Sequence, residues 1–87
     1  MDIEFGDKKE ADNLRVHKLS LALSVFVLET RVVEFEDDRH DYGERRMIVF
    51  GYLAGRLHCC VYTMRGTTYR IISLRKANDR EQAKWAP

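Results

Sequence analysis

The chain has 87 residues, few prolines and abundant aliphatic and aromatic side chains, which indicates one folded domain and excludes a disordered chain. The longest apolar stretch, residues 21–28, is too short to span a bilayer, and the acidic N-terminus lacks the apolar segment of a signal peptide. The net charge of +1 is the sum of two halves of opposite charge. Residues 1–44 contain six Lys/Arg and twelve Asp/Glu, whereas residues 45–87 contain nine Lys/Arg and two Asp/Glu. This asymmetry is typical of a basic, nucleic-acid-binding surface, or else of two halves that neutralise each other. We expect a single domain over residues 1–87, a cytoplasmic location and no membrane partner.

The first half of the chain predicts a short strand followed by two helices. Residues 2–5 have the pattern of a strand. Asp7 followed by Glu10 resembles a capping box, which predicts a first helix that ends near His17. Ser20 can cap a second helix with an apolar face.

The second half predicts a β-meander. Residues 32–35 switch to β-branched and aromatic side chains, and a polar, acidic loop over residues 36–44 follows. Three further strands are expected, over residues 46–53, 56–63 and 68–75. Asn78 or Asp79 can cap a short final helix that ends near Trp85.

The turns between these strands determine which side chains share a face of the sheet. We expect a two-residue turn at residues 54–55, and a turn around residues 65–66 that places Thr63 opposite Thr68. One predicted face is apolar, and we expect the two N-terminal helices to cover it: Ile48, Phe50, Tyr52, Leu57, Cys59, Val61, Ile72 and Leu74. The opposite face mixes cations, aromatic rings and hydroxyls: Arg45, Met47, Val49, Gly51, Arg56, His58, Cys60, Tyr62, Tyr69, Ile71, Ser73 and Arg75.

The mixed face is predicted to bind nucleic acid, since arginine forks hold phosphates and aromatic rings stack on bases. The candidate binding residues are Arg45, Arg56, Tyr62 and Tyr69, with Arg65 at an exposed turn to steer a polyanion. Packing of the tyrosines on the sheet explains them equally well.

Two groups of residues have the chemistry of metal ligands, the cysteines and His40 with its neighbouring aspartates. Cys59 and Cys60 are neighbours in a predicted strand and therefore point to opposite faces, so we expect free thiols and a reducing compartment. His40 and the aspartates around it have no recognised metal-binding spacing. We expect neither a metal nor a cofactor.

Several spaced motifs resemble the BrnT family. They are residues 34–39, 42–46, 55–57, 61–63 and above all 70–77, together with Phe5, Asp7, Asn13, His17, Arg80 and Glu81. The resemblance covers nearly the whole chain. It implies a toxin of a bacterial type II toxin–antitoxin system, with a RelE-like fold and ribonuclease activity, that is neutralised by a DNA-binding antitoxin, BrnA. The expected partners are therefore RNA and a BrnA-type antitoxin, with DNA contacted only through the antitoxin.

The same resemblance implies a fold of class α+β. The expected RelE-like sheet is antiparallel, with a short N-terminal strand, two helices, a four-stranded meander, the helices on one face and a short C-terminal helix.

Metal-free RNA cleavage requires a base for the 2′-hydroxyl, cations for the charge that builds on the phosphate, and an acid for the leaving 5′-oxygen. With the resemblance, Arg70, Arg75 and Lys76 are the candidate cations, and Ser73 is a candidate hydrogen-bond donor to phosphate. Imidazole exchanges protons near neutral pH, which makes His17 the first candidate acid or base; Glu81 is the second.

Each of these residues also has a structural interpretation. Arg75 and Lys76 could form a solvated strand end, and Arg70 could pair with the acidic residues 36–38. The serine could satisfy a backbone group, and both acid–base candidates could be ordinary helix residues.

This chain departs from the family pattern at four places, which include Gly6 where an aromatic residue is common and residues 21–23 where the second helix usually has acidic residues. Trp85 stands where the family usually has Tyr, and indole offers only an N–H donor. Val16 and Lys18 flank His17 where the family usually has Lys and Gly. These departures leave open a noncatalytic, diverged module that binds antitoxin or RNA without cleavage, and, third, a purely structural domain.

Overall fold

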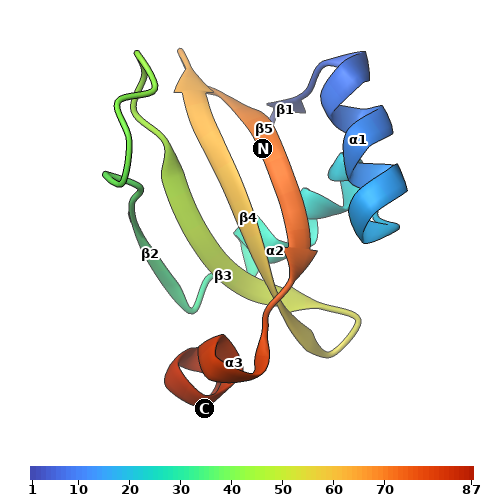
Figure 1. The fold of residues 1–87 in the computed structure, drawn as a ribbon, viewed down its shortest axis with the longest axis vertical. Coiled ribbons are helices and arrows are strands. Elements are labelled where there is room, and N and C mark those ends of the chain that lie inside the picture. The colour runs from blue at the N-terminus through green and yellow to red at the C-terminus, as the bar shows by residue number, and fades with distance from the viewer.

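The computed structural model describes residues 1–87 as one five-stranded sheet with helices packed on it (Figure 1). The elements in chain order are β1 (Ile3–Glu4), α1 (Asp7–His17), the 3₁₀ helix η1 (Leu21–Leu23), α2 (Ser24–Glu29), β2 (Val33–Glu36), β3 (Met47–Leu53), β4 (Arg56–Arg65), β5 (Thr68–Lys76) and α3 (Asp79–Trp85). The strands lie in the order β1-β5-β4-β3-β2. The predicted α+β class is confirmed. The expectation of a wholly antiparallel sheet is wrong, because β1 pairs parallel to β5. No helix is long and apolar enough to cross a membrane.

The capping box predicted at Asp7 is absent. Gly6 is the N-cap of α1 and no side chain caps the helix. The Glu10 carboxylate instead accepts hydrogen bonds from the Ser20 hydroxyl at 2.6 Å and from the Leu21 amide at 2.8 Å. Glu10 therefore joins α1 to η1, since these donors lie at the start of the next helix and an unpaired amide there would be costly.

The 3₁₀ helix η1 and α2 cover the face opposite to the one predicted for the N-terminal helices, whereas α1 lies beside the edge of β5. Their core residues on the sheet are Val49, Cys60, Tyr62, Ile71 and Leu74, packed against Leu21, Val27 and Leu28. In Figure 1 the strands lie in front of α2. Gly51 explains the choice of face, since a Cβ there would collide with the carbonyl oxygen of Val27 in α2. Both faces are apolar enough to be buried, so alternation alone did not decide between them.

The register between β3 and β4 is as predicted, whereas that between β4 and β5 differs. Phe50 lies opposite Cys59, but Thr63 lies opposite Arg70 instead of Thr68. Strand β4 continues to Arg65 and β5 begins at Thr68, so the turn is at residues 66–67. Compared with the predicted turn at residues 65–66, the turn lies one residue further along the chain.

A β-bulge in β5 alters the alternation further along the strand. Ile71 lies opposite Tyr62, but the next pair is Ser73 with Val61, so Ile72 is an extra residue. The bulge places Ser73 and Arg75 on the face that η1 and α2 leave free, which we call the open face, and it buries Leu74 beneath these two helices. Both cysteines are free, as predicted. They pack in different clusters, Cys59 on the open face and Cys60 beneath the helices.

Asn13 connects α1 to the edge of β5. Its side-chain amide donates to the carbonyl oxygens of Leu74 at 2.8 Å and Leu19 at 2.9 Å, and its oxygen accepts from the Leu74 amide at 3.0 Å. Strand β1 reaches only as far as Tyr69 and Arg70, so it leaves this part of the β5 edge unpaired. The buried Asn13 side chain completes the edge next to Arg75.

Candidate functional site

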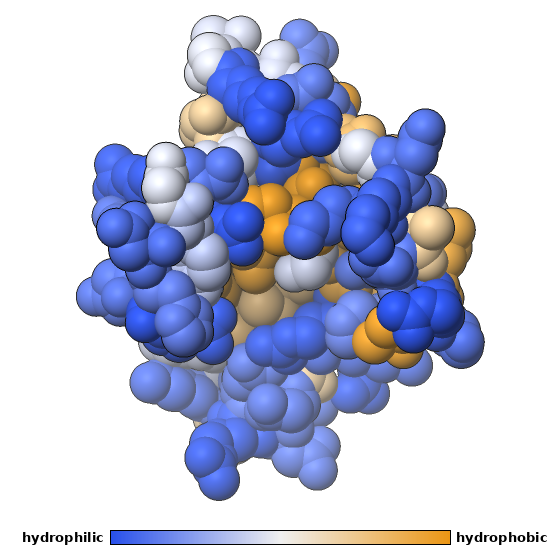
Figure 2. Space-filling view, turned by 45° about the horizontal axis from the view of Figure 1, so that its top comes forward, coloured by the Kyte–Doolittle hydropathy of each residue, from blue (hydrophilic) through white to orange (hydrophobic).

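A cleft of about 480 Å³ lies on the open face, between α3 on one side and β2 with its following loop on the other. Its floor is formed by sheet residues: Ile48, Phe50, Cys59, Val61 and Ser73. Four cations surround it: Arg39, Arg75, Arg80 and Lys84. Figure 2 shows apolar surface in a hollow with a hydrophilic rim. An apolar floor with a cationic rim suits a ligand that has both flat apolar and anionic parts.

Arg75 is held in this cleft by Glu81. Its Nη1 donates to Glu81 Oε1 at 2.7 Å, and its Nη2 donates to Oε2 at 2.9 Å. The guanidinium holds the pKa of the Glu81 carboxyl below its usual range. Glu81 is therefore ionised and already engaged, which favours a role in orienting Arg75 over the predicted role as a base.

Glu81 also forms part of the N-terminal cap of α3. Its Oε1 accepts from the Asn78 amide at 2.9 Å, and Asn78 Oδ1 accepts from the Glu81 amide at 2.8 Å. This capping box makes Asn78 the N-cap of α3, one of the two residues predicted to cap this helix. The cap of α3 and the orientation of Arg75 thus depend on one carboxylate.

Ser73 and His17 line a second, smaller cleft of about 180 Å³ between α1 and β5. Ser73 also lines the main cleft, so the two clefts adjoin at this residue. The structure thus brings four of the residues predicted for catalysis to two adjoining clefts, Ser73, Arg75 and Glu81 to the main one and His17 to the smaller one. Cys59 on the cleft floor is a protonated thiol at neutral pH, because burial raises its pKa to about 11.

Lys76 and Arg70 lie outside the main cleft. Lys76 pairs with His58 in the sheet and faces the opposite side from Arg75, since side chains alternate along a strand. The expectation that the two cations act together is not met by the structure. Arg70 is near the start of β5, where its Nη1 lies 3.8 Å from Glu4 Oε2, so its ion pair is not with the acidic residues 36–38.

The tyrosines predicted to stack on bases lie on the helix-covered side of the sheet. Tyr62 is 4 % exposed, and its hydroxyl donates to Glu34 at 2.7 Å. Burial raises the pKa of the Tyr62 hydroxyl. Tyr69 packs edge-on against Tyr62 and accepts a hydrogen bond from Arg31 at 2.6 Å. The prediction of an exposed aromatic surface here is wrong, because the helices cover the other face from the one expected.

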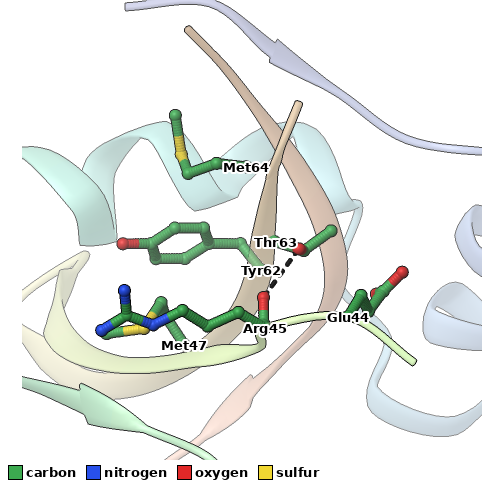
Figure 3. A pocket seen from close by; sticks show the side chains of 6 residues that line it. All are labelled: Glu44, Arg45, Met47, Tyr62, Thr63 and Met64. Carbon is green, nitrogen blue, oxygen red and sulfur yellow. Dashed lines mark hydrogen bonds between the residues drawn. The ribbon is translucent and has the colours of Figure 1, made fainter. Parts of the chain in front are cut away.

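Arg45 borders a separate pocket of about 440 Å³ (Figure 3). In the figure its side chain runs along the pocket near Tyr62, while Thr63 donates its hydroxyl to the Arg45 carbonyl at 2.7 Å. Arg45 Nε is paired with Glu36 at 2.9 Å, and Glu44 is a further carboxylate in the lining. This pocket has little net positive charge, so it is a weaker candidate for an anion than the cleft of the open face.

The remaining two predicted binding residues lie at opposite ends of β4. Arg56 adjoins the β3–β4 turn and donates to the Ala77 carbonyl at 3.1 Å. Arg65 is exposed at the end of the strand, as predicted. Neither lines the cleft.

Sequence reasoning did not select four residues of the cleft: Phe35, Arg39, Arg80 and Lys84. Three of them lie in motifs that carried the family resemblance, at residues 34–39 and 80–81. That location was the available signal, since the loop and α3 meet over the sheet only in the folded chain.

A cleft lined by cations suits a protein that acts on RNA, and the comparison of the chain with known families points to such a protein. Residues 5–81 match the family model of the ribonuclease toxin, BrnT, of type II toxin–antitoxin systems. A search of curated proteins gives no significant match. The chain belongs to the BrnT family of ribonuclease toxins.

Proposed function

We propose that this protein is a RelE-like, metal-independent endoribonuclease that cuts RNA in the cleft of the open face. The observation that carries the proposal is the position of Arg75, fixed by Glu81 among three further cations. Paired or clustered guanidinium groups suit phosphate because they offer charge and two parallel donors. Family membership supports ribonuclease activity in general, and the cationic lining of the cleft supports the choice of this site for it.

The proposed reaction is transfer within the RNA backbone. The ribose 2′-oxygen loses its proton and attacks the neighbouring phosphorus, the bond from phosphorus to the 5′-oxygen breaks, and a proton is delivered to that oxygen. The products are a 2′,3′-cyclic phosphate and a 5′-hydroxyl. The nucleophile belongs to the substrate, so the protein has to supply proton transfer and charge stabilisation, which cationic and neutral side chains can provide.

The residues of the open face are assigned roles on this basis. Arg75 stabilises the charge that develops on the phosphate oxygens, and Ser73 donates a hydrogen bond to the same group. His17, in the adjoining cleft, is the proposed acid or base. Glu81 orients Arg75 and is not itself a base in this scheme.

The proposed partner is a BrnA-type antitoxin, through which the complex would contact DNA, and the proposed location is the cytoplasm. A type II toxin–antitoxin family implies an antitoxin protein as partner. Growth arrest on expression of this chain alone, relieved by co-expression of the antitoxin, would support the pairing.

Cleavage of RNA by the purified protein in the presence of EDTA tests the proposed activity. We expect cleavage to persist with the chelator, to give a cyclic phosphate end, and to fall by about a hundredfold or more in Arg75→Ala, the loss typical of one stabilising donor. Intact RNA that is nevertheless bound would favour a noncatalytic binding module, and loss of cleavage on chelation would contradict metal independence.

A further inference from the structure

An aromatic surface lies at one end of the cleft, where β2 and α3 approach each other over the sheet. Phe35 of β2, Phe50 of β3 and Trp85 of α3 have ring centroids 6.1 to 6.4 Å apart. Phe50 is buried, but Phe35 is 40 % exposed and Trp85 is partly exposed. Large exposed aromatic rings inside a cleft are unfavourable in water and suit a flat apolar ligand.

A cation lies beside this surface. Lys84 Nζ is over the Trp85 ring, 4.8 Å from its centroid. The lysine is exposed and its stem is flexible, so a base can take its place over the indole while the ammonium group stays close to a neighbouring phosphate.

Arg39 reaches the cleft from the loop that follows β2. Its Nε and Nη2 each donate to the Asp37 carboxylate at 2.8 Å, while 69 % of its side chain is exposed. Asp37 is buried and accepts a further hydrogen bond from the Tyr42 hydroxyl at 3.0 Å. Arg39 is thus fixed along one edge of its guanidinium, and Nη1 is left for an anion.

We infer that this end of the cleft binds one unpaired nucleotide of the RNA, with the base on Phe35 and Trp85 and the phosphate on Arg39. The inference rests on the proposed function and adds the substrate class, which is single-stranded RNA. A base in a duplex is already stacked on both sides, so it cannot also lie on an aromatic wall inside a cleft.

Trp85 is the single tryptophan of the chain, so its fluorescence reports on this site alone. The wild-type protein is titrated with a 2′-O-methyl oligoribonucleotide, which cannot be cleaved because its 2′-oxygen carries no proton. We expect the single strand to quench Trp85 emission. We expect the same strand annealed to its complement, and an abasic strand of equal length, to leave the emission unchanged.

Variants assign the base and the phosphate separately. In anisotropy titrations with the labelled single strand, Phe35→Ala and Trp85→Ala are expected to weaken binding about tenfold, whereas Trp85→Phe retains most of it. Phe26→Ala removes a ring that is 50 % exposed on α2 and serves as the matched control, without effect. Arg39→Ala is expected to weaken binding of the abasic strand as well, whereas Arg15→Ala on α1 does not.

Circular dichroism confirms folding of each variant. Equal quenching by single strand, duplex and abasic strand would overturn the inference, as would unchanged binding in both aromatic variants. Cleavage that depends on Arg75 would still uphold the proposed function in that case. Quenching by the single strand without any cleavage of ordinary RNA would support this inference and contradict the proposed enzyme.

Discussion

The guanidinium of Arg75 and the carboxylate of Glu81 form a two-point ion pair across the junction between β5 and α3. Because the same carboxylate caps α3, the helix cannot move without disturbing Arg75. A site residue on a strand is thereby oriented by the helix that follows it in the chain. This arrangement limits the orientations of the guanidinium, so the group has to rearrange less when the transition state forms.

Glu81→Gln is expected to reduce cleavage while the protein remains folded. Glutamine can still take part in a capping box, but it cannot form the charged two-point pair with Arg75. We expect kcat to fall about tenfold or more with a smaller change in KM. Asp79→Asn removes a carboxylate from the same helical turn without a contact to Arg75, and an equal loss in that variant would contradict the positioning role.

Arg75→Ala and Lys76→Ala should differ strongly although the residues are neighbours. Arg75 lines the cleft, whereas Lys76 faces the opposite side of the sheet. We expect single-turnover cleavage to fall about a hundredfold or more in the first variant and to change little in the second. Similar losses in both would show that the site is not confined to the open face.

Stability should decrease at acidic pH through Asp37 and Glu81. The bonds from Arg39 hold the pKa of Asp37 well below its usual range, and Arg75 lowers that of Glu81. A carboxyl whose pKa is lower in the folded state stabilises the protein above its unfolded pKa, and this contribution is lost as the pH falls through the folded value.

We therefore expect the urea midpoint to fall as the pH is lowered below about 4, the ordinary range of these carboxyls. The double variant Asp37→Asn/Glu81→Gln should be less stable at neutral pH and show a shallower decline. A wild-type midpoint that does not change between neutral pH and pH of about 3 would contradict this prediction.

Asn13→Ala is expected to lower the free energy of unfolding by about 2–4 kcal/mol. The substitution leaves the Leu74 amide and two carbonyl oxygens without partners, and each buried unpaired group costs about 1–3 kcal/mol. Asp12→Ala, next to it on the more exposed side of α1, should cost less than about 0.5 kcal/mol. Urea denaturation measures both.

Gly51→Ala should destabilise the packing of α2 on the sheet. A methyl group there meets the Val27 carbonyl, which belongs to backbone and cannot turn away. We expect a loss of about 1–3 kcal/mol or more and a lower melting temperature. Gly43 has open space around it, so Gly43→Ala should lower the free energy of unfolding only through the strain of its positive φ, by about 1–2 kcal/mol.

The sequence predicted the elements well because local signals set them. The two-residue turn at Ala54 and Gly55, the alternation in β3 and β4, and the cap at Asn78 each depend on a few neighbouring residues. The covered face was mistaken because both faces of the central strands are apolar. Gly51 was the one local sign of close helix packing, and its meaning depends on a helix elsewhere in the chain.

The candidate site was predicted in part. The family motif pointed to Ser73 and Arg75, and the structure places both at the cleft. Arg39 and Trp85 are brought to it by tertiary packing of a loop and a terminal helix, which no periodicity describes. The bulge in β5 has no distinctive composition, so the face to which Ser73 and Arg75 point relative to the start of the strand could not be predicted from the sequence.

The bulge at Ile72 determines to which side of the sheet the following side chains of β5 point. If every residue were kept but β5 alternated regularly, Leu74 would point into the cleft and Arg75 would point beneath the helices. A relative that lacked this one position would instead pair regularly and keep Arg75 on the open face. A relative that kept the position but lost the bulge would have an inverted strand end, and the same sequence motif would no longer mark a phosphate-binding site.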